Sequence, residues 1–147
     1  LTVPADHQIS TLELVKDSLA GKILIDVTVP LVPPKVGTVQ MPPEGSAGKR
    51  AQDFLGEEVR VISAFQNIAA HLLQQDVTIE CDVLVTGNDK ESRQRVIDMI
   101  GEAGMTGWHA GPIANAAAAE SLTSILIQIN RSGGISHSGI KIIGQEH

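Results

Sequence analysis

The sequence alternates short apolar runs of strand length with stretches of helical character. Three near-continuous apolar runs occur, at residues 22–27, 59–64 and 81–86. Such runs are typical of strands in a parallel sheet that is covered on both faces. Apolar residues at helical spacing, or helix start and stop signals, mark four other segments, at residues 9–20, 46–55, 88–103 and 113–131. This alternation predicts an α/β fold built on a parallel sheet.

Individual helix signals make testable predictions. Ser46 is predicted to N-cap the second helix, and Gly56 to end it. Asn88, with Glu91 three residues later, predicts a capping box at the start of the third helix. In the fourth helix, apolar residues at i, i+3, i+4 and i+7 predict a buried stripe of Leu122, Ile125, Leu126 and Ile129. Residues 106–109 are expected to form a short strand, and residues 135–143 to return as an extended tail.

The glycine pattern limits which part of a nucleotide-binding fold this chain can supply. Such folds carry G-x-G-x-x-G directly after their first strand, and this motif is absent from the sequence. Gly101, Gly104 and Gly107 are spaced G-x-x-G-x-x-G and follow a helix. Residues 45–49 (G-S-A-G-K) lack the first glycine and the hydroxyl residue of a P-loop, so they are interpreted as a helix start. We therefore expect the chain to be the distal part of a dinucleotide-binding protein.

Composition and missing motifs exclude several classes of function. A net charge of −6 and only 2% aromatic residues argue against nucleic acid as a partner. No apolar run approaches the ~20 residues of a membrane span. The single cysteine, Cys81, is predicted to be a buried thiol in a reducing cytoplasm. The five histidines have no metal-site spacing, and there is no G-x-S-x-G elbow, so neither a zinc site nor a serine hydrolase is predicted.

Three segments rich in small residues remain as candidate ligand contacts. Residues 1–5, 28–34 and 65–70 each follow a predicted strand and would meet at the carboxyl edge of the sheet, where α/β proteins bind ligands. The alanine run at 114–119 has two interpretations: close packing against the core or a second subunit, which is favoured, or contact with a ligand. No side-chain acid, base or nucleophile is predicted as catalytic. Hydride transfer between two bound cofactors has no such requirement, because it depends on positioning.

Six short motifs, taken in order, carry a family resemblance. They are T-V-P at residues 2–4, P-L-V-P at 30–33, V-I-S-A at 61–64, D-V-x-V-x-G-N-D at 82–89, A-G-P-I-x-N at 110–115 and E-S-L-T at 120–123. Together they resemble the NADPH-dependent reductases of the deazaflavin coenzyme F-420. The resemblance covers essentially the whole chain, with similar gaps between the motifs. By the usual size of the leading βαβ units, the chain lacks the first ~75 residues of that family, which carry the glycine loop.

The resemblance implies an oxidoreductase that transfers a hydride between NADP(H) and coenzyme F-420. The implied fold is the distal part of a Rossmann-type parallel sheet, residues 1–64, followed by a small C-terminal α/β capping domain, residues 65–147. Thr2, Val3 and Pro4 would flank the nicotinamide ribose, with Val32 near the same cofactor. The floor where the two rings meet would be Gln66, Asn67, Ile68 and Ala70. Pro112, Ile113 and Asn115 would line the deazaflavin side.

One departure from the family affects the floor. Relatives read H-T-I-P-A where this chain reads Q-N-I-A-A at residues 66–70, so the polar contact to the deazaflavin differs here. Two alternatives to the reductase remain open: an NADPH domain like that of ferric reductases, and a non-catalytic remnant whose alanine-rich helix serves as an oligomerisation surface. We expect a homo-oligomer with that helix near the contact, and weak or no NADP(H) binding by the 147 residues alone.

Overall fold

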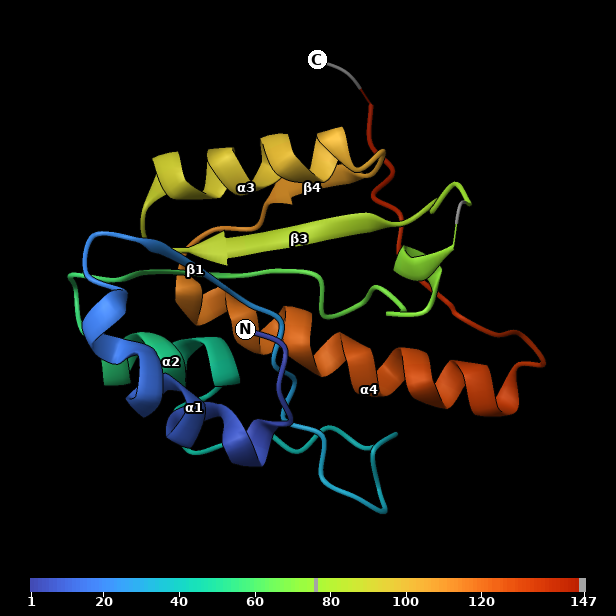
Figure 1. Ribbon diagram of the computed structural model, residues 1–147. Coiled ribbons are helices and arrows are strands. Elements are labelled where there is room, and N and C mark those ends of the chain that lie inside the picture. Colours follow the sequence, from blue (N-terminus) through green and yellow to red (C-terminus); the bar gives the residue numbers. More distant parts are fainter. Residues whose placement is uncertain (76, 146–147) are drawn as a thin grey trace.

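The computed structural model describes residues 1–75 and 77–145 and confirms an α/β fold (Figure 1). Its elements, in chain order, are η1 (Ala5–His7), α1 (Gln8–Val15), η2 (Lys16–Ser18), β1 (Ile23–Asp26), α2 (Ala47–Leu55), β2 (Arg60–Ser63), η3 (Leu72–Gln74), β3 (Asp82–Gly87), α3 (Lys90–Glu102), β4 (Thr106–His109), η4 (Ile113–Asn115) and α4 (Ala116–Ser132). All the predicted strands, including the short one at residues 106–109 (β4), and all four predicted helices are present.

The strands form one sheet in the order β1-β2-β3-β4. The β1–β2 and β3–β4 pairs are parallel, whereas β2 and β3 are antiparallel and are joined only where Ile62 faces Gly87 and Ser63 faces Thr86. The parallel pairing predicted for the first part of the chain is therefore present in β1 and β2, and the antiparallel junction joins that pair to β3 and β4. A parallel neighbour requires a crossover that returns the chain to the start of the sheet. The described residues between β2 and β3 contain only the short η3 turn, so the chain reverses direction.

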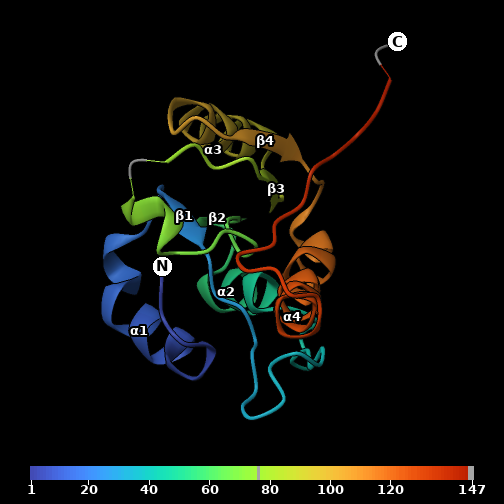
Figure 2. The same ribbon diagram turned by 90° about the vertical axis from the view of Figure 1, so that its right-hand side faces the viewer.

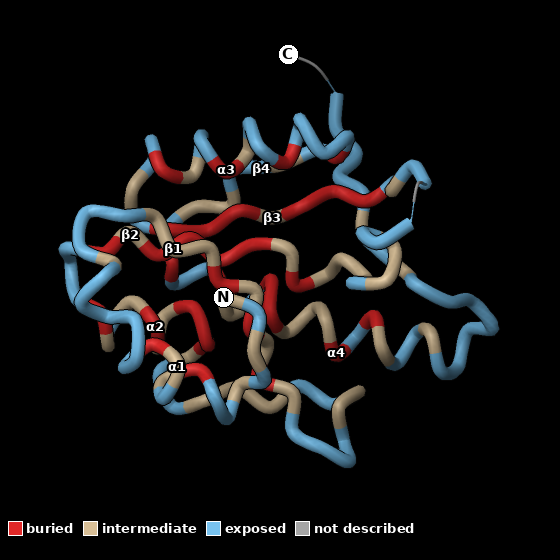
Figure 3. The backbone as a smooth tube through the Cα atoms, in the orientation of Figure 1, coloured by how far each residue is buried: buried red, intermediate tan, exposed pale blue. Residues whose placement is uncertain are grey.

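Helices cover both faces of the sheet. Helices α1, α2 and α4 lie on one side and α3 on the other (Figures 1 and 2). Val61 and Ile62, adjacent in β2, point to opposite faces and belong to different core clusters. The buried members of the first cluster are Leu12, Ala51, Leu55, Val59, Val61, Ile113 and Ala116. Those of the second are Ile62, Ala64, Val83, Val85, Val96, Ile100 and Met105. The buried stretches of Figure 3 follow the sheet and the helix sides that face it.

Both clusters combine residues from before and after position 64. Ile113 and Ala116 pack with the first half of the chain, and Ile62 and Ala64 pack with the second. Packing therefore runs across the boundary that the sequence suggested. The division into 1–64 and 65–147 stays a prediction about domain organisation.

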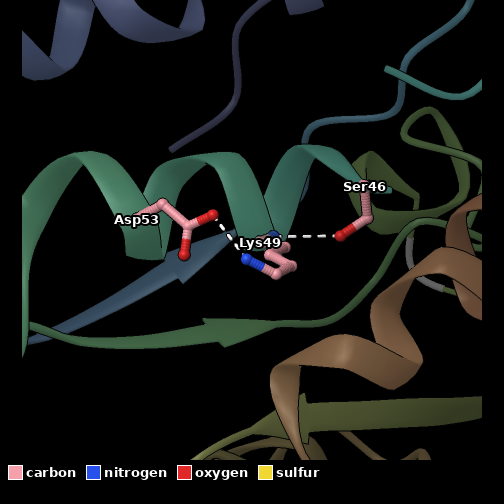
Figure 4. Close-up of polar contacts among 3 residues, drawn as sticks. All are labelled: Ser46, Lys49 and Asp53. Atoms are coloured by element: carbon pink, nitrogen blue, oxygen red, sulfur yellow. Dashed lines mark hydrogen bonds and ion pairs between the residues drawn. The ribbon is translucent and has the colours of Figure 1, made fainter. Parts of the chain in front are cut away.

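Local capping signals placed α2 correctly. The Ser46 side chain accepts a hydrogen bond from the backbone N–H of Lys49 at 2.9 Å (Figure 4), and Gly56 ends the helix with φ +75°. The predicted capping box of α3 is wrong, because Asp89 is the N-cap and accepts the N–H of Ser92 at 2.7 Å. Asn88 Oδ1 instead accepts the N–H of Ile113, a tertiary contact that local sequence does not reveal.

The buried face of α4 also differs from its predicted stripe. Leu126 is buried, but Ile125 and Ile129 are 48% and 39% exposed. The face that packs inward is instead formed largely by small and polar residues, namely Ala116, Ala119, Glu120 and Ser124, together with Leu126. Close approach of α4 to α2 selects small side chains on the contact face, since a Cβ placed on Gly48 would lie 3.3 Å from Glu120 Oε1. Larger apolar residues are therefore left outside.

Cys81 is buried, as predicted, and burial raises the pKa of its thiol. The tail after α4 passes beside it: the backbone N–H of Ile140 points at Cys81 Sγ, and the Ile140 carbonyl accepts the N–H of Asp82 at 2.9 Å. A Cβ on Gly139 would come within 2.5 Å of Cys81 Sγ. The tail therefore returns along the start of β3, although it forms no regular strand in the described residues up to 145.

Candidate functional site

Three of the predicted ligand segments leave the sheet at the same edge. The amino group of Leu1 donates to Ile25 O at 2.5 Å, and the N–H of Val27 donates to Leu1 O at 3.1 Å, the pattern of a parallel pair. On the other side of β1, the N–H of Ala64 donates to Asp26 O at 3.2 Å. Residue 1, β1 and β2 thus run side by side in one direction. The segments that follow them start next to one another at the carboxyl edge.

The residues predicted for the nicotinamide side lie at this edge. Thr2, Pro4 and Val32 are exposed, and Val3 is half-buried. Val32 lines a cavity of about 180 Å³ that is shared with Ala5 and Arg50. The Val32 carbonyl accepts a hydrogen bond from Gln40 Nε2 at 3.2 Å, which holds the proline-rich loop over this cavity.

The predicted floor contributes to a second small cavity, of about 140 Å³, which is lined by Gln66, Asn67 and Ile68 together with Thr123 of α4. Ala70 is exposed beside it. Gln66 is buried, and its amide nitrogen donates inward to Ser63 Oγ at 2.6 Å and to Asp26 O at 3.2 Å.

Gln66 and Asn67, the two floor residues that differ from those of the family, both hold residues 66–70 in place. Like Gln66, Asn67 donates its amide nitrogen to the protein, to Asp82 O at 2.9 Å and to Cys81 Sγ at 3.2 Å. Their amide N–H donors therefore tie the floor to β1, β2 and β3. The side-chain amide N–H groups of Gln66 and Asn67, which stand where relatives have His and Thr, thus form hydrogen bonds within the protein.

The residues predicted for the deazaflavin side lie at the other end of the sheet. Pro112, Ile113 and Asn115 follow Gly111, whose carbonyl accepts the N–H of Gly87 at the end of β3. This end is the β3 arrowhead in Figure 1, whereas the start of β3 lies beside the floor, where Asn67 donates to Asp82 O. Ile113 is a core residue, and Asn115 donates to Ala110 O at 2.7 Å. The structure does not bring these three residues to the floor, and their role stays a prediction.

A larger cavity, of about 580 Å³, lies near that same end, between the start of β2 and the start of α3. It includes Asp53, Arg60 and Asp89 but none of the predicted site residues. We place the candidate site at the carboxyl edge of β1 and β2 instead, because ligands of open α/β sheets bind beyond the carboxyl ends of parallel strands. Size alone does not identify a site.

Sequence reasoning missed a buried carboxylate, Glu120 of α4. It is 1% exposed, and its two oxygens accept the backbone N–H groups of Ala47 at 2.7 Å and Gly48 at 2.8 Å, in the first turn of α2. Burial raises the pKa of Glu120 to about 7, the two N–H groups oppose this rise, and the charge of Asp26 adds to it. The sequence does mark this residue as unusual, because Glu120 is the only Asp, Glu, Lys or Arg between Glu102 and Arg131.

A chain of buried hydrogen bonds extends from this point. Gln8, fully buried in α1, donates to Asp26 Oδ2 at 2.5 Å and to Ala47 O at 2.9 Å. Its oxygen accepts from Arg50 Nε at 2.7 Å, and the same guanidinium donates to Ala5 O at 2.9 Å. Asp26 Oδ1 accepts the N–H of Thr28 at 3.0 Å. We call Gln8, Asp26, Arg50 and Glu120 the buried polar network.

The start of α2 is therefore not available as a phosphate site, which agrees with the interpretation of residues 45–49 as a helix start. Its first N–H groups already donate to Glu120 and Ser46. Within residues 1–75 and 77–145, no three His, Cys, Asp or Glu side chains are grouped to hold a metal ion. No helix in the same residues has the length and apolar character of a membrane span.

The fold defines a Rossmann-type α/β protein, with the candidate site at the carboxyl edge of the parallel strands β1 and β2. The chain is 33% identical, over 99% of its length, to the F420-dependent NADP reductase of Methanocaldococcus jannaschii, of which it covers 67%. It is 34% identical to the enzyme of the same name from Methanothermobacter marburgensis, of which it covers 66%. No family model matches the chain.

A solved structure agrees with these relatives. A candidate F420-dependent NADP-reductase from Arthrobacter sp. FB24 superposes with a TM-score of 0.82 at 25% identity, over 97% of this chain and 67% of that one. The chain belongs to the family of F420-dependent NADP reductases. It spans about two thirds of the length of the relatives that it matches.

Proposed function

We propose that this chain takes part in hydride transfer between NADP(H) and the deazaflavin coenzyme F-420, at the carboxyl edge formed by residues 2–5, 28–34 and 66–70. The observation that carries the proposal is the convergence of these three segments beside the parallel strands in a member of this reductase family. NADP(H) supplies or receives the hydride, and F-420 is the other partner in the transfer.

The residues at this edge fit the ring ends of such cofactors. Val3, Ile68 and Ala70 are small or aliphatic, which allows flat rings to approach closely. Thr28 Oγ1 lies at the start of the loop after β1, and it is the one buried side-chain oxygen or nitrogen in the described residues that has no protein partner. A hydroxyl in that state is suited to a polar ligand group, because buried polar groups are normally hydrogen-bonded. The phosphate cradle has no counterpart, since the sequence contains no G-x-G-x-x-G.

The chain's own role is to bind and orient the rings and to keep water away from them. Reaction requires the two carbons to lie ~3–3.5 Å apart, so the floor must be both small and rigid. Gln66 and Asn67 supply the rigidity through their bonds to Ser63, Asp26 and Asp82. The hydride passes directly between the two rings, and reduction of the deazaflavin also takes up one proton at a ring nitrogen. We assign that proton to solvent and to no side chain, because hydride transfer itself depends on positioning.

An isotope experiment tests this proposal. NADPH carrying deuterium on either face of its nicotinamide is mixed with F-420 and the chain, joined to a glycine loop either in a longer form of this protein or in a fusion to the first third of a curated relative. Deuterium from one face should appear in the reduced deazaflavin. Label in water, or no reduction, would contradict direct transfer and would favour the non-catalytic alternative.

We further propose that the protein is a homo-oligomer with α4 near the contact. Ile125 and Ile129 lie one turn apart on α4 and are both exposed, which makes an apolar surface that a second copy could cover.

A reducing, cytoplasmic location is proposed from the lone, buried Cys81. Alkylation of protein that is unfolded directly from cells should find this thiol free. A modified thiol would count against the location.

A further inference from the structure

All three segments of the proposed site are held by the buried polar network. Arg50 donates to the carbonyl of Ala5, at the end of the first segment. Asp26 accepts the N–H of Thr28, at the start of the second. The third is held at Gln66, which donates to the Asp26 carbonyl and whose own carbonyl accepts from Thr123 Oγ1 at 2.9 Å. Parts of the site that are distant in sequence thus share one set of partners.

Glu120 is the member that connects this network to α4. Both of its oxygens face the start of α2, where the helix dipole favours a negative charge. The charged groups near it are Asp26 from β1, which repels the carboxylate, and Arg50 from α2, which attracts it. Gln8 from α1 is neutral and bridges Asp26, Arg50 and the carbonyl of Ala47. When both acids are ionised, the network holds two negative charges and one positive charge.

We propose that Glu120 is a positioning residue for the ligand edge, and that its ionisation sets where the start of α2 lies relative to residues 2–5, 28–34 and 66–70. An ionised carboxylate accepts from both N–H groups. A protonated one keeps one carbonyl oxygen as a full acceptor, but its other oxygen becomes an O–H group that accepts only weakly, so the hydrogen bond from either Ala47 or Gly48 is weakened. In this proposal the start of α2 shifts when that bond weakens. The shift is passed to Arg50 and to the Ala47 carbonyl, both of which Gln8 connects to Asp26. The identification of these segments as the site rests on the proposed function.

Nuclear magnetic resonance of the 147-residue chain tests the coupling without any cofactor. The backbone N–H signals of Ala47 and Gly48 should titrate with a common midpoint near pH 7, the pKa of Glu120. The N–H signals of Thr28 and Gln66 should follow with the same midpoint, which a purely local helix cap would not cause. The side-chain carboxyl carbon of Glu120 reports the ionisation itself, so the wild-type chain alone decides the outcome.

Two variants sharpen this experiment. Glu120→Gln should abolish the shared titration at all four N–H groups, whereas Glu102→Gln, at an exposed acid in the last turn of α3, should leave it intact. If Thr28 and Gln66 do not titrate with Ala47 and Gly48, Glu120 is only a cap and the proposal fails. It also fails if none of the four signals moves across neutral pH.

A kinetic measurement separates this inference from the proposed function. In the cofactor-loaded protein, Glu120→Gln should lower kcat about tenfold with little change in KM, because displacements approaching 1 Å cost up to about a hundredfold in rate. It should also remove an inflection near pH 7 from the wild-type profile of kcat. Absence of hydride transfer in the wild type would refute the function and leave the magnetic resonance test intact. An unchanged kcat and profile in Glu120→Gln would overturn the positioning role.

Discussion

Gly48 and Glu120 lie 72 positions apart in sequence, yet the backbone N–H of Gly48 donates to Glu120 Oε1 at 2.8 Å. The glycine makes this approach possible. A Cβ at position 48 would lie 3.0 Å from Ser63 Cβ and 3.3 Å from both Glu120 Oε1 and Ile113 Cδ1. Helices α2 and α4 and strand β2 therefore meet at a point where only hydrogen fits without adjustment.

Replacing this glycine should destabilise the protein. Gly48→Ala is expected to lower the free energy of unfolding by about 1–3 kcal/mol, the usual cost of overpacking a core. The matched control is Gly101→Ala in α3, where a Cβ meets nothing within 4 Å, and which should raise stability by about 0.5–1 kcal/mol. Urea unfolding of the three proteins provides the measurement. Equal effects at both positions would show that the close approach is not tight.

The stability of the protein should depend on the ionisation of Glu120. Its pKa is raised from 4.5 to about 7 in the folded protein, so its contribution is fully present below about pH 4.5 and is lost as pH rises through 7. Relative to Glu120→Gln, the wild type should therefore lose up to about 3 kcal/mol over this interval. Urea unfolding of both proteins at a series of pH values checks the sign. If the free energy of unfolding changes with pH in the same way in both proteins, the ionisation of Glu120 does not contribute to stability.

Extra bulk at the floor should slow turnover more than it weakens cofactor binding. Ala70→Leu would push apart two rings whose reacting carbons must lie ~3–3.5 Å apart. We expect a large fall in kcat with NADPH affinity nearly unchanged, measured in a protein that also carries the glycine loop. Asp98→Ala, on the exposed face of α3, is the control and should keep wild-type rates. Wild-type turnover in Ala70→Leu would mean that the site lies elsewhere.

The 147 residues alone should bind NADP(H) weakly or not at all. A pyrophosphate is held by backbone N–H groups at a helix start. Here the first N–H groups of α2 are already used by Glu120 and Ser46. Calorimetric titration with NADPH measures this directly. Micromolar affinity for this chain would refute the prediction.

The apolar face of α4 should mediate self-association. Ile125→Glu places a charge in the proposed contact and is expected to shift the protein to a smaller species in sedimentation velocity. Leu14→Glu, at an exposed apolar residue of α1 away from α4, should leave the assembly unchanged. A monomeric wild type at high concentration would contradict the proposal.

The sequence by itself determined the features that depend on neighbours a few residues away. The order of strands and helices, and both ends of α2 at Ser46 and Gly56, follow from apolar spacing and capping, which are local. The resemblance carried by short motifs led to the right family for the same reason, since motifs are read in order along the chain.

Only the tertiary structure decided the features that depend on contacts between distant residues. These are the antiparallel β2–β3 junction, the choice of Asp89 rather than Asn88 as the N-cap of α3, and the inward face of α4. Periodicity shows that α4 is amphipathic, but not that close approach at Gly48 would favour its small residues over Ile125 and Ile129. The role of Glu120 was hidden for the same reason: a lone carboxylate in an apolar helix is satisfied by two N–H groups that lie more than 70 residues away.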